Sequence, residues 1–394
     1  FVELFYWACS VAGKSRKYGV KILILIHSLH AGGAERVAAN LANAWAERGW
    51  AMTVVTLASR DRDFYTLHPA VRRVALDLAS DSGNVLKGFW ANLRRLAALR
   101  RVLREERPDV VLGMIATAAV LSILASVGLS CKILACEHIH PPRLGAGTVW
   151  HWLRRRSYPY AARVVVLTDK SREWIQTHVP GCRLTVIPNA VPFPLPISEL
   201  TLPPEQVVPG HRRIVLAVGR LTEQKGFDLL IEAFAGTAMA HADWDLVVLG
   251  EGPERAALEG QVAALGLDHR VKLAGRAGNM ADWYARADLY VMSSRFEGFP
   301  LVLTEAMAHG CPVVSFDCDT GPRDVIRDGV DGRLVRPVKN IEALAAALTQ
   351  LMDDEALRKR MAEQALEVRV RFSMARILSM WDHVFEELTN EAAG

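Results

Sequence analysis

Residues 212–234 read RRIVLAVGRLTEQKGFDLLIEAF, in which a Val/Ile/Leu-rich run is followed by a short polar loop and then by a stretch of helical period. An unbroken apolar run of this kind is typical of a strand buried on both faces in a parallel sheet. The loop joins the carboxyl end of that strand to the next helix, and ligands of open α/β sheets bind at such ends. The stretch therefore predicts a strand, a helix and a place to look for a binding site.

The same alternation continues on both sides of this stretch. Toward the carboxyl terminus it predicts strands at 244–252, 270–275, 288–294 and 312–317. Toward the amino terminus it predicts strands at 21–29, 52–58, 110–115, 132–138 and 163–168, with a helix at 34–49. The Pro-rich stretch 187–210 interrupts the pattern and has the composition of a linker. We therefore expect an α/β protein with two doubly wound domains.

The expected division of the chain follows from these breaks. We predict a leader or disordered segment, an N-terminal domain, a linker, a C-terminal domain and a final helix, at residues 1–19, 20–190, 191–210, 211–375 and 376–394. The apolar stretch at 1–13 is shorter than the ~20 residues that span a bilayer, and its positive charges follow it, unlike those of a signal peptide. No later stretch is long and apolar enough, so we expect no membrane span.

Charge is distributed unevenly along the chain. Residues 1–190 carry 26 Lys and Arg against 13 Asp and Glu, whereas residues 191–394 carry 21 against 30. A basic half indicates an anionic partner such as phosphate, acidic lipid or nucleic acid. No nucleic-acid motif is present, so we expect no nucleic-acid partner. Neither a Cys/His pattern typical of zinc nor an Asp-x-Asp site stands out, so we expect no metal and no cofactor.

The strongest local signal is RFEGFPLVLTEAMAHGCPVV, residues 295–314. Glu297 follows a predicted strand, Gly298 permits a close backbone approach, and Glu305 lies eight residues later on a helix that Pro300 opens. A helix amino terminus offers free N–H groups to phosphate, and carboxylates accept hydrogen bonds from sugar hydroxyls. The combination suits a sugar nucleotide, although either Glu taken alone also fits a solvated surface residue.

A second signal is the loop of GRLTEQKGFDLLIEAF, residues 219–234. Arg220 follows the strand, and Lys225 precedes Gly226 and the next helix. Both cations can reach one diphosphate at the carboxyl end of the strand. The alternative is that both are exposed loop charges.

These motifs resemble, in order, those of the retaining glycosyltransferases of family 4, which have the GT-B fold. The resemblance rests on GRLTEQKG, VVLGEGP, the two Glu residues of FEGFPLVLTEAMAHGCPVV, and TGPRDVIRDGVDGRLV, and it extends over residues 21–390. It implies two Rossmann-like domains that face each other across a cleft. The final helix, 376–394, is then a candidate to cross back to the N-terminal domain.

The resemblance also implies roles for single residues. Arg220 and Lys225 would bind the donor diphosphate, Glu297 the hydroxyls of the transferred sugar, and Glu305 the ribose. The backbone that cradles donor sugar and phosphate would be that of Gly298, Phe299, Pro300 and Leu301, although Pro300 has no N–H to donate. Gly275 and Arg276 lie where the family packs the nucleobase.

The N-terminal half contains SLHAGGAERVAANLA, residues 28–42, and ACEHIHPPR, residues 135–143. The first is not the dinucleotide motif GxGxxG. The family uses this loop beside the donor phosphates (Gly33) and the acceptor (Gly32), and a tight turn needed only for packing is the alternative. The family places a His like His138 against the transferred sugar, and His140 is a competing candidate. Asp324 departs from the family, which commonly has Glu at this position.

We therefore expect a retaining hexosyltransferase that uses a UDP-hexose or UDP-N-acetylhexosamine donor. Its acceptor would be a glycan or a polyprenyl-diphosphate-linked glycan in surface polysaccharide biosynthesis. Two alternatives are a sugar-nucleotide epimerase of the same fold and a non-catalytic nucleotide or lipid-surface binding protein. The expected location is the cytoplasm, peripherally on the cytoplasmic face of the membrane.

The membrane expectation rests on two stretches, KGFWANLRRLAALRRVLRE (87–105) and VWHWLRRRSYPY (149–160). Aromatic residues beside clustered arginines suit an anionic membrane surface. The apolar residues expected on this face are Phe89, Trp90, Leu93, Leu96, Leu103, Trp150 and Trp152, and the arginines are Arg94, Arg95, Arg100, Arg101, Arg104, Arg154, Arg155 and Arg156. The alternative is that the apolar residues face the core and the arginines form an ordinary solvated face.

Overall fold

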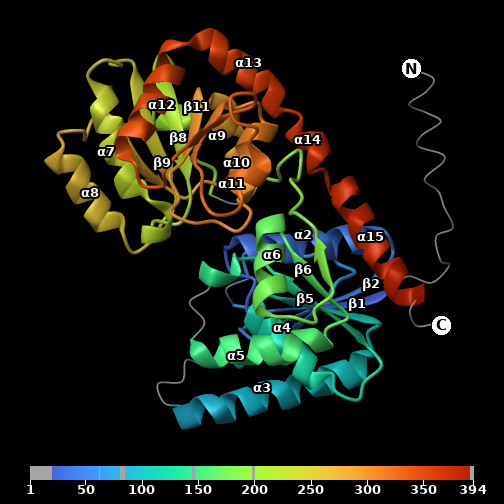
Figure 1. Ribbon diagram of the computed structural model, residues 1–394. Helices are drawn as coiled ribbons and strands as arrows, with labels where there is room; N and C mark the ends of the chain where they lie inside the picture. Colours follow the sequence, from blue (N-terminus) through green and yellow to red (C-terminus); the bar gives the residue numbers. More distant parts are fainter. Residues whose placement is uncertain (1–19, 62, 80–84, 144–146, 198–199, 391–394) are drawn as a thin grey trace, which may run out of the picture. The chain divides into compact units, whose positions relative to one another are not determined.

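The computed structural model describes residues 20–61, 63–79, 85–143, 147–197 and 200–390. Helices lie beside two separate sheets, one from each half of the chain (Figure 1). The predicted leader, residues 1–19, lies outside the described residues. Within the described residues, no helix is long and apolar enough to cross a membrane.

The first sheet has seven strands in the order β3-β2-β1-β4-β5-β6-β7. They are β1 (Lys21–Ile26), β2 (Ala51–Thr56), β3 (Arg72–Ala75), β4 (Val110–Met114), β5 (Lys132–Glu137), β6 (Arg163–Val166) and β7 (Leu184–Val186). β1 pairs in parallel with β2 on one side and with β4 on the other. The reversal of strand order at β1 is that of a doubly wound Rossmann-like sheet.

The second sheet repeats this plan with six strands in the order β10-β9-β8-β11-β12-β13. They are β8 (Arg213–Val218), β9 (Trp244–Leu249), β10 (Val271–Gly275), β11 (Leu289–Met292), β12 (Val313–Phe316) and β13 (Arg333–Val335). β8 pairs in parallel with both β9 and β11, so the order reverses at β8. The predicted α/β class with two parallel sheets is therefore confirmed.

Helices connect the strands in both halves. Those of the first half are α2 (Gly33–Glu47), α3 (Val85–Glu106), α4 (Ala116–Ala125), α5 (Thr148–Ser157) and α6 (Asp169–His178), with 3-10 turns η1 (Pro141–Arg143) and η2 (Tyr158–Tyr160). Those of the second half are η3 (Pro204–Gln206), η4 (Glu223–Lys225), α7 (Phe227–Ala238), α8 (Arg255–Ala264), α9 (Met280–Arg286), α10 (Leu301–Ala308), α11 (Pro322–Val325), α12 (Ile341–Asp353), α13 (Glu355–Ala365), α14 (Val368–Arg371) and α15 (Met374–Asn390).

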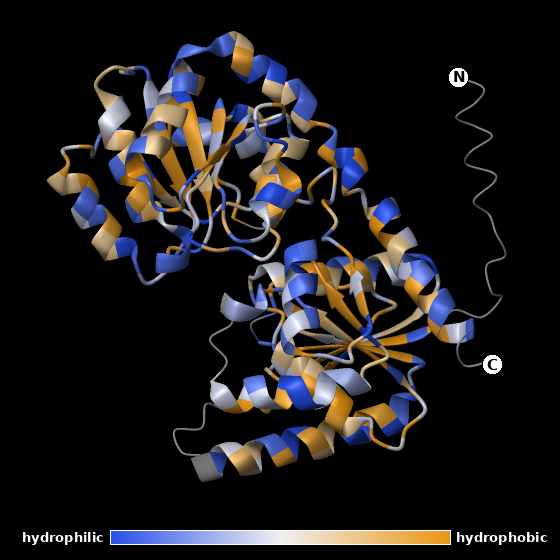
Figure 2. Ribbon diagram, in the orientation of Figure 1, coloured by the Kyte–Doolittle hydropathy of each residue, from blue (hydrophilic) through white to orange (hydrophobic). Residues whose placement is uncertain are grey.

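The second sheet separates two hydrophobic cores. Because strand side chains alternate between faces, Val215 and Ala217 of β8 pack with α7 and α12, whereas Ile214 and Leu216 pack with α9 and α10. Both faces of β8 are thus buried, which explains its unbroken apolar sequence. Figure 2 shows hydrophobic residues concentrated on the strands of both sheets.

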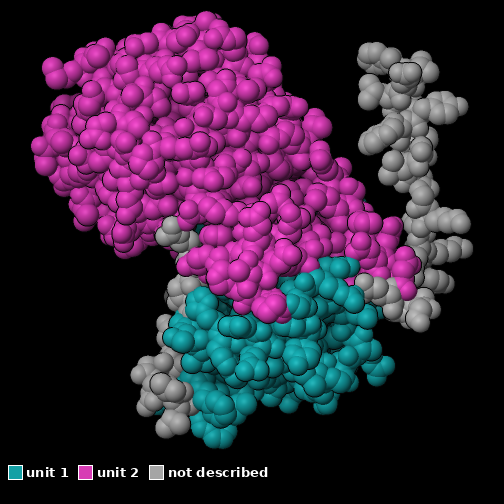
Figure 3. Space-filling model, in the orientation of Figure 1, with its two compact units in different colours: residues 1–136, 147–164, 181–183 teal, residues 137–146, 165–180, 184–394 magenta. Residues whose placement is uncertain are grey.

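Contacts divide the chain into two compact units (Figure 3). Unit 1 comprises residues 1–136, 147–164 and 181–183, and unit 2 comprises residues 137–146, 165–180 and 184–394. Part of the predicted linker is packed, since Val191, Leu195 and Val208 are buried in a core of the second sheet. The predicted domain boundaries stay a prediction.

Three short strands have no counterpart among the predicted ones. β3, β7 and β13 each lie at one end of a sheet. Their sequences are RRVA, LTV and RLV, and most of their residues are only half-buried. A strand with one neighbour does not require an unbroken apolar run, so the pattern used to predict strands does not detect it.

The surface of α3 and α5 is aromatic and basic. On α3, the exposed fraction is 58% for Phe89, 62% for Trp90 and 39% for Leu93, and on α5 it is 57% for Trp152. Exposed arginines on the same helices are Arg94, Arg101, Arg104, Arg155 and Arg156. Hydrophilic and hydrophobic residues alternate along both helices in Figure 2. Exposed aromatic residues of this size need an explanation beyond packing.

The prediction that these residues lie on the exposed face is wrong for some of them. Leu103 and Arg154 are buried, with exposed fractions of 2% and 1%, and Leu96 and Trp150 are only half-buried. Arg100 donates to the carbonyl oxygens of Ala125 and Val127, at 2.7 Å each. These side chains support the fold because the helical period turns them inward.

Candidate active site

The candidate residues of the second sheet follow neighbouring strands. Arg220 and Lys225 follow β8, and Glu297 follows β11. β8 and β11 are adjacent in the sheet although two strands separate them in sequence. Because parallel strands end at the same edge, the reversal of strand order brings both loops to the point where such sheets bind ligands.

Lys225 and Glu297 form an ion pair. Nζ of Lys225 donates to Oε1 of Glu297 at 2.6 Å, and the hydroxyl of Ser294 donates to the same oxygen at 2.7 Å. The Glu297 side chain is 8% exposed and the Lys225 side chain 19%. Short charge-assisted hydrogen bonds of this kind are strong. Glu297 is therefore a buried, held carboxylate, and the alternative of a solvated loop residue is wrong.

The loop after β12 supports the Glu297 loop. Oγ1 of Thr320 donates to the backbone oxygen of Glu297 at 2.6 Å. Gly321 has a φ of +93°, and a Cβ at this position would lie 2.7 Å from Cδ of Pro300. Glycine suits both the positive φ and the close approach. The TGPRD segment thus fixes the backbone that carries Glu297.

Asp324 acts at the start of its own helix, α11. Its Oδ2 accepts a hydrogen bond from the backbone N–H of Gly321 at 2.8 Å. Burial raises the pKa of the Asp324 carboxyl above its usual range. The carboxylate therefore holds Gly321 in place against the loop of Pro300.

Glu305 lies on α10, where its side chain is buried. Its exposed fraction is 1%, and Oε2 accepts a hydrogen bond from the hydroxyl of buried Tyr284 at 3.1 Å. Burial and then the nearby charges of Glu297 and Glu305 raise the pKa of the Tyr290 phenol well above its usual range. The charges of both carboxylates thus act on one buried phenol. The alternative that Glu305 is a surface helix residue is wrong.

Residues 298–301 form the turn that starts α10. Pro300 is the N-cap, and Leu301 is the first helical residue. A Cβ at Gly298 would lie 2.3 Å from the backbone oxygen of His138, which belongs to the same compact unit. Phe299 is 6% exposed and belongs to a hydrophobic core. Only the backbone of Phe299 is therefore available for the predicted cradle.

The two candidate histidines differ in their hydrogen bonds. Both ring nitrogens of His138 are buried, and neither has a hydrogen-bond partner among the described residues. Burial lowers the pKa of His138 to about 4, so its ring is neutral near pH 7. His140 is buried as well, but its Nδ1 is 3.0 Å from the Ser171 hydroxyl. His138 is therefore the better placed of the two to bind a ligand.

Further along the second sheet lie the other predicted donor residues. Arg220 is exposed after β8, and Arg276 is exposed after β10. Gly275 ends β10 with a φ of +81°, and a Cβ there would lie 3.2 Å from Oε1 of Glu251. In sheet order, Gly275 lies at the end of β10, the two cations follow β8, and the Glu297 carboxylate follows β11.

Gly32 and Gly33 belong to unit 1, and all other candidates belong to unit 2. Gly32 is the N-cap of α2, and the hydroxyl of Tyr65 accepts from its N–H at 3.2 Å and donates to its oxygen at 2.9 Å. A Cβ at Gly33 would have no atom within 4 Å. Gly32 is thus held in the turn, and Gly33 is open.

Sequence reasoning missed Ser294, Thr320 and Tyr284. Each makes a hydrogen bond to Glu297 or Glu305. An isolated Ser, Thr or Tyr forms no sequence pattern that predicts a binding role, so only the folded structure identifies these residues. Of the three, only Thr320 belongs to a family motif, TGPRDVIRDGVDGRLV.

Family models match both halves of the chain. Residues 31–193 match the model described as Glycosyltransferase Family 4, and residues 199–368 match the model described as Glycosyl transferases group 1. The second match contains the loops of Lys225 and Glu297. The first contains Gly32, Gly33 and His138.

Three relatives of known name are similar in sequence. An exopolysaccharide phosphotransferase of Streptomyces coelicolor is 35% identical over 74% of this chain, and the match spans 30% of that protein's length. The amylovoran biosynthesis glycosyltransferase AmsD of Erwinia amylovora is 28% identical over 92% of this chain and 99% of its own. A Campylobacter jejuni N-acetylgalactosaminyltransferase, named for a diNAcBac-PP-undecaprenol-linked substrate, is 28% identical over 94% of this chain and 99% of its own.

Solved structures share the fold. A sucrose-phosphate synthase of Thermosynechococcus elongatus aligns with a TM-score of 0.81 and 22% identity, over 95% of this chain and 100% of its own. Anabaena HepE, solved with UDP and glucose, aligns with a TM-score of 0.76 and 22% identity, over 94% of this chain and 99% of its own. Together with the two family models, these findings confirm the expected family and fold. The chain belongs to the glycosyltransferases, with a family 4 domain followed by a group 1 domain in a GT-B fold.

Proposed function

We propose that the chain transfers a hexose or N-acetylhexosamine from a uridine-diphosphate donor, in the biosynthesis of a polysaccharide or lipid-linked glycan. The observation that carries the proposal is the 2.6 Å contact between Lys225 and Glu297 where β8 and β11 end. A cation and a carboxylate so close together match the diphosphate and the sugar hydroxyls, which are neighbours in a nucleotide sugar. HepE, solved with UDP and glucose, supports a uridine donor.

Lys225 and Arg220 would stabilise the leaving diphosphate. The bond between the anomeric carbon and the phosphate oxygen breaks, the acceptor oxygen bonds to that carbon, and the acceptor proton passes to the leaving phosphate. Positive groups aimed at the phosphate neutralise the charge that develops there. The anomeric configuration is retained because the acceptor attacks from the face that the phosphate leaves.

Glu297 and His138 would orient the sugar, and no residue acts as a covalent nucleophile. Glu297 Oε1 is held by Lys225 and Ser294, so its position is defined before a hydroxyl donates to the carboxylate. The neutral ring of His138 offers one donor and one acceptor nitrogen, which suits a sugar hydroxyl. Positioning of this kind lowers the entropic part of the barrier.

The nucleoside would bind along the same edge of the sheet, at Glu305 and at Gly275 and Arg276. Glu305, oriented by the Tyr284 hydroxyl, would accept hydrogen bonds from the ribose. Gly275 and Arg276 would pack against the base, because the Arg276 guanidinium can stack on an aromatic ring.

We propose that transfer needs no metal ion. The diphosphate would meet Arg220, Lys225 and the amino-terminal turn of α10, which together supply positive charge and N–H donors. The metal-free proposal rests on these groups. Among the described residues, no three His, Cys, Asp or Glu side chains are grouped as metal ligands.

For the acceptor we propose a glycan, including one linked to a polyprenyl diphosphate, reached at the cytoplasmic face of a membrane. The Campylobacter relative is named for an undecaprenol-linked substrate. The exposed Phe89, Trp90 and Trp152 would enter the headgroup region, while nearby arginines attract anionic lipid at ~1 kcal/mol each. The protein would therefore dock peripherally through α3 and α5.

The test is a thermal-shift panel with UDP, GDP and ADP, followed by transfer from the matching nucleotide sugars to glycan and lipid-linked acceptors. We expect UDP to raise the melting temperature most, because RT ln(1 + [L]/Kd) grows with affinity. Proton NMR of the product then gives its anomeric configuration. Stabilisation by none of the three nucleotides would refute the donor proposal, and an inverted product would refute retention.

A further inference from the structure

Arg295, two residues before Glu297, reaches across to the segment that carries Lys225. Its Nη1 and Nη2 donate to Oδ1 and Oδ2 of Asp228 at 2.8 and 2.6 Å, and Nη1 also donates to the backbone oxygen of Glu223 at 2.6 Å. The Arg295 side chain is 15% exposed. Such a two-pronged guanidinium–carboxylate pair fixes direction as well as distance.

The electrostatics of this pair are consistent with a persistent contact. Burial alone would raise the pKa of Asp228, but hydrogen bonds and the charge of Arg295 lower it below its usual range. Asp228 also lies in the first turn of α7, where the helix dipole favours a negative charge. Asp228 is therefore ionised at neutral pH, and its carboxylate can pair with Arg295.

Backbone contacts join the same two segments, 223–228 and 293–296. The backbone N–H of Arg295 donates to the oxygen of Gln224 at 2.8 Å, and Nε2 of Gln224 donates to the oxygen of Phe296 at 3.0 Å. Oγ of Ser293 donates to the backbone oxygen of Lys225 at 2.9 Å. Gly226, with a φ of +63°, approaches so closely that a Cβ would lie 2.2 Å from the oxygen of Ser293.

Lys225 belongs to one of these segments and Glu297 follows directly on the other. We propose that Arg295 is a positioning residue for sugar transfer. It fixes the position of Lys225 relative to Glu297. The proposal rests on the donor role of those two residues. Both terminal nitrogens of Arg295 are engaged by Asp228 and Glu223, so the role proposed for Arg295 is exerted through Lys225 and Glu297.

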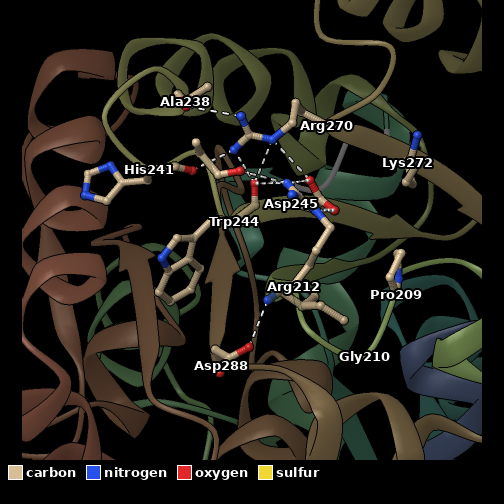
Figure 4. A network of polar contacts seen from close by, with 12 residues as sticks. Pro209, Gly210, Arg212, Ala238, His241, Trp244, Asp245, Arg270, Lys272 and Asp288 are labelled. Carbon is tan, nitrogen blue, oxygen red and sulfur yellow. Dashed lines mark hydrogen bonds and ion pairs between the residues drawn. The ribbon is translucent and has the colours of Figure 1, made fainter.

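The first variant is Arg295→Lys, with Arg212→Lys as its matched control. Lysine keeps the charge but cannot bind both carboxylate oxygens through a planar fork. Arg212 forms a similar fork on Asp245, with bonds of 2.5 and 2.6 Å, and Arg270 converges on the same carboxylate (Figure 4). That network lies at the amino ends of β8 and β9, away from the candidate site.

We expect both lysine variants to lower the melting temperature, and only Arg295→Lys to lower kcat/KM, by about tenfold or more. A small misplacement of catalytic groups costs up to ~10²-fold. Equal losses of kcat/KM in the two variants would mean that Arg295 merely supports the fold, and the proposal would be overturned.

A double-mutant cycle with Lys225→Met tests the coupling through equilibrium binding of the complete donor, UDP-glucose or UDP-N-acetylglucosamine, measured by calorimetry without acceptor. If the thermal-shift panel selects GDP or ADP, the corresponding nucleotide sugar replaces this donor. We expect Arg295→Gln to weaken binding about tenfold in the wild-type background and less than about twofold beside Lys225→Met, because residues that act through one another are not additive. Equal factors in both backgrounds would overturn the proposal.

The same cycle separates this proposal from the proposed function. If Lys225→Met itself binds the complete donor as the wild type does, the donor role of Lys225 fails, and the positioning role fails with it. If Lys225→Met binds weakly while Arg295→Gln binds normally, only the positioning role of Arg295 fails.

Discussion

Replacing Lys225 by Met should separate stability from activity at the Lys225–Glu297 pair. The change leaves a carboxylate that is 8% exposed without its cation, although Ser294 still donates to it. Removing one partner of a buried ion pair costs ~3–5 kcal/mol. Because Lys225 is 19% exposed and Ser294 remains, we expect the lower end, about 3 kcal/mol. For a unit of this size that lowers the melting temperature by about 6–12 °C.

The double variant Lys225→Met/Glu297→Leu removes both charges. Replacing a buried pair by apolar groups of similar volume is often neutral, so we expect most of the lost stability to return. Activity should not return, because the diphosphate loses its cation and the sugar loses its acceptor oxygen. Loss of one such electrostatic group costs ~10²–10³ in kcat.

Calorimetric melting and initial transfer rates measure the two effects on the same samples. The single variants Lys225→Met and Glu297→Leu complete the cycle. The reasoning is refuted if the double variant melts below Lys225→Met. It is also refuted if Lys225→Met keeps kcat/KM within about threefold of the wild type, because transition-state stabilisation would then not depend on Lys225.

Three further predictions concern pH, metal and membrane. Burial lowers the pKa of His138 from 6.5 to about 4, so the unfolded state binds the proton first as the pH drops. Stability should therefore fall between pH 6.5 and about pH 4. Melting curves recorded over this pH range should show a smaller fall for His138→Gln. EDTA should leave transfer intact, and a loss that Mg²⁺ or Mn²⁺ restores would contradict the metal-free mechanism. In liposome co-sedimentation, binding should rise with anionic lipid, fall with salt and weaken in the variant Arg155→Ser/Arg156→Ser. The control variant Lys359→Ser/Arg360→Ser should bind as the wild type does. Equal recovery in the supernatant with neutral and anionic vesicles at low salt would refute docking.

The sequence predicts the structure well at positions where a single physical requirement decides the residue type. The apolar run of β8 is unbroken because both of its faces are buried, and Gly226 precedes α7 because a side chain there would meet Ser293. Lys225 and Glu297 could be proposed as site residues because both follow predicted strands. That their strands are neighbours depends on the reversal of strand order at β8, which no local pattern encodes.

Burial of polar groups is the part that the sequence could not supply. Arg154 lies within an arginine cluster, yet it is 1% exposed while its neighbours Arg155 and Arg156 are exposed. The pairing of Arg295 with Asp228 links residues 67 positions apart and leaves no spacing signal. In both cases the side chain's partners come from other elements, so its environment is decided by packing and not by local sequence.

The ion pair also constrains how a donor binds. Lys225 and Glu297 already neutralise each other, so a diphosphate that binds Lys225 must compete with the Glu297 carboxylate for it. That exchange is unfavourable unless the carboxylate gains other donors, because an unpaired buried charge is costly. The hydroxyls of the attached sugar can supply them. A nucleotide diphosphate without its sugar should thus gain less from Lys225 than the complete donor, and the pair would favour the whole donor over the nucleotide product.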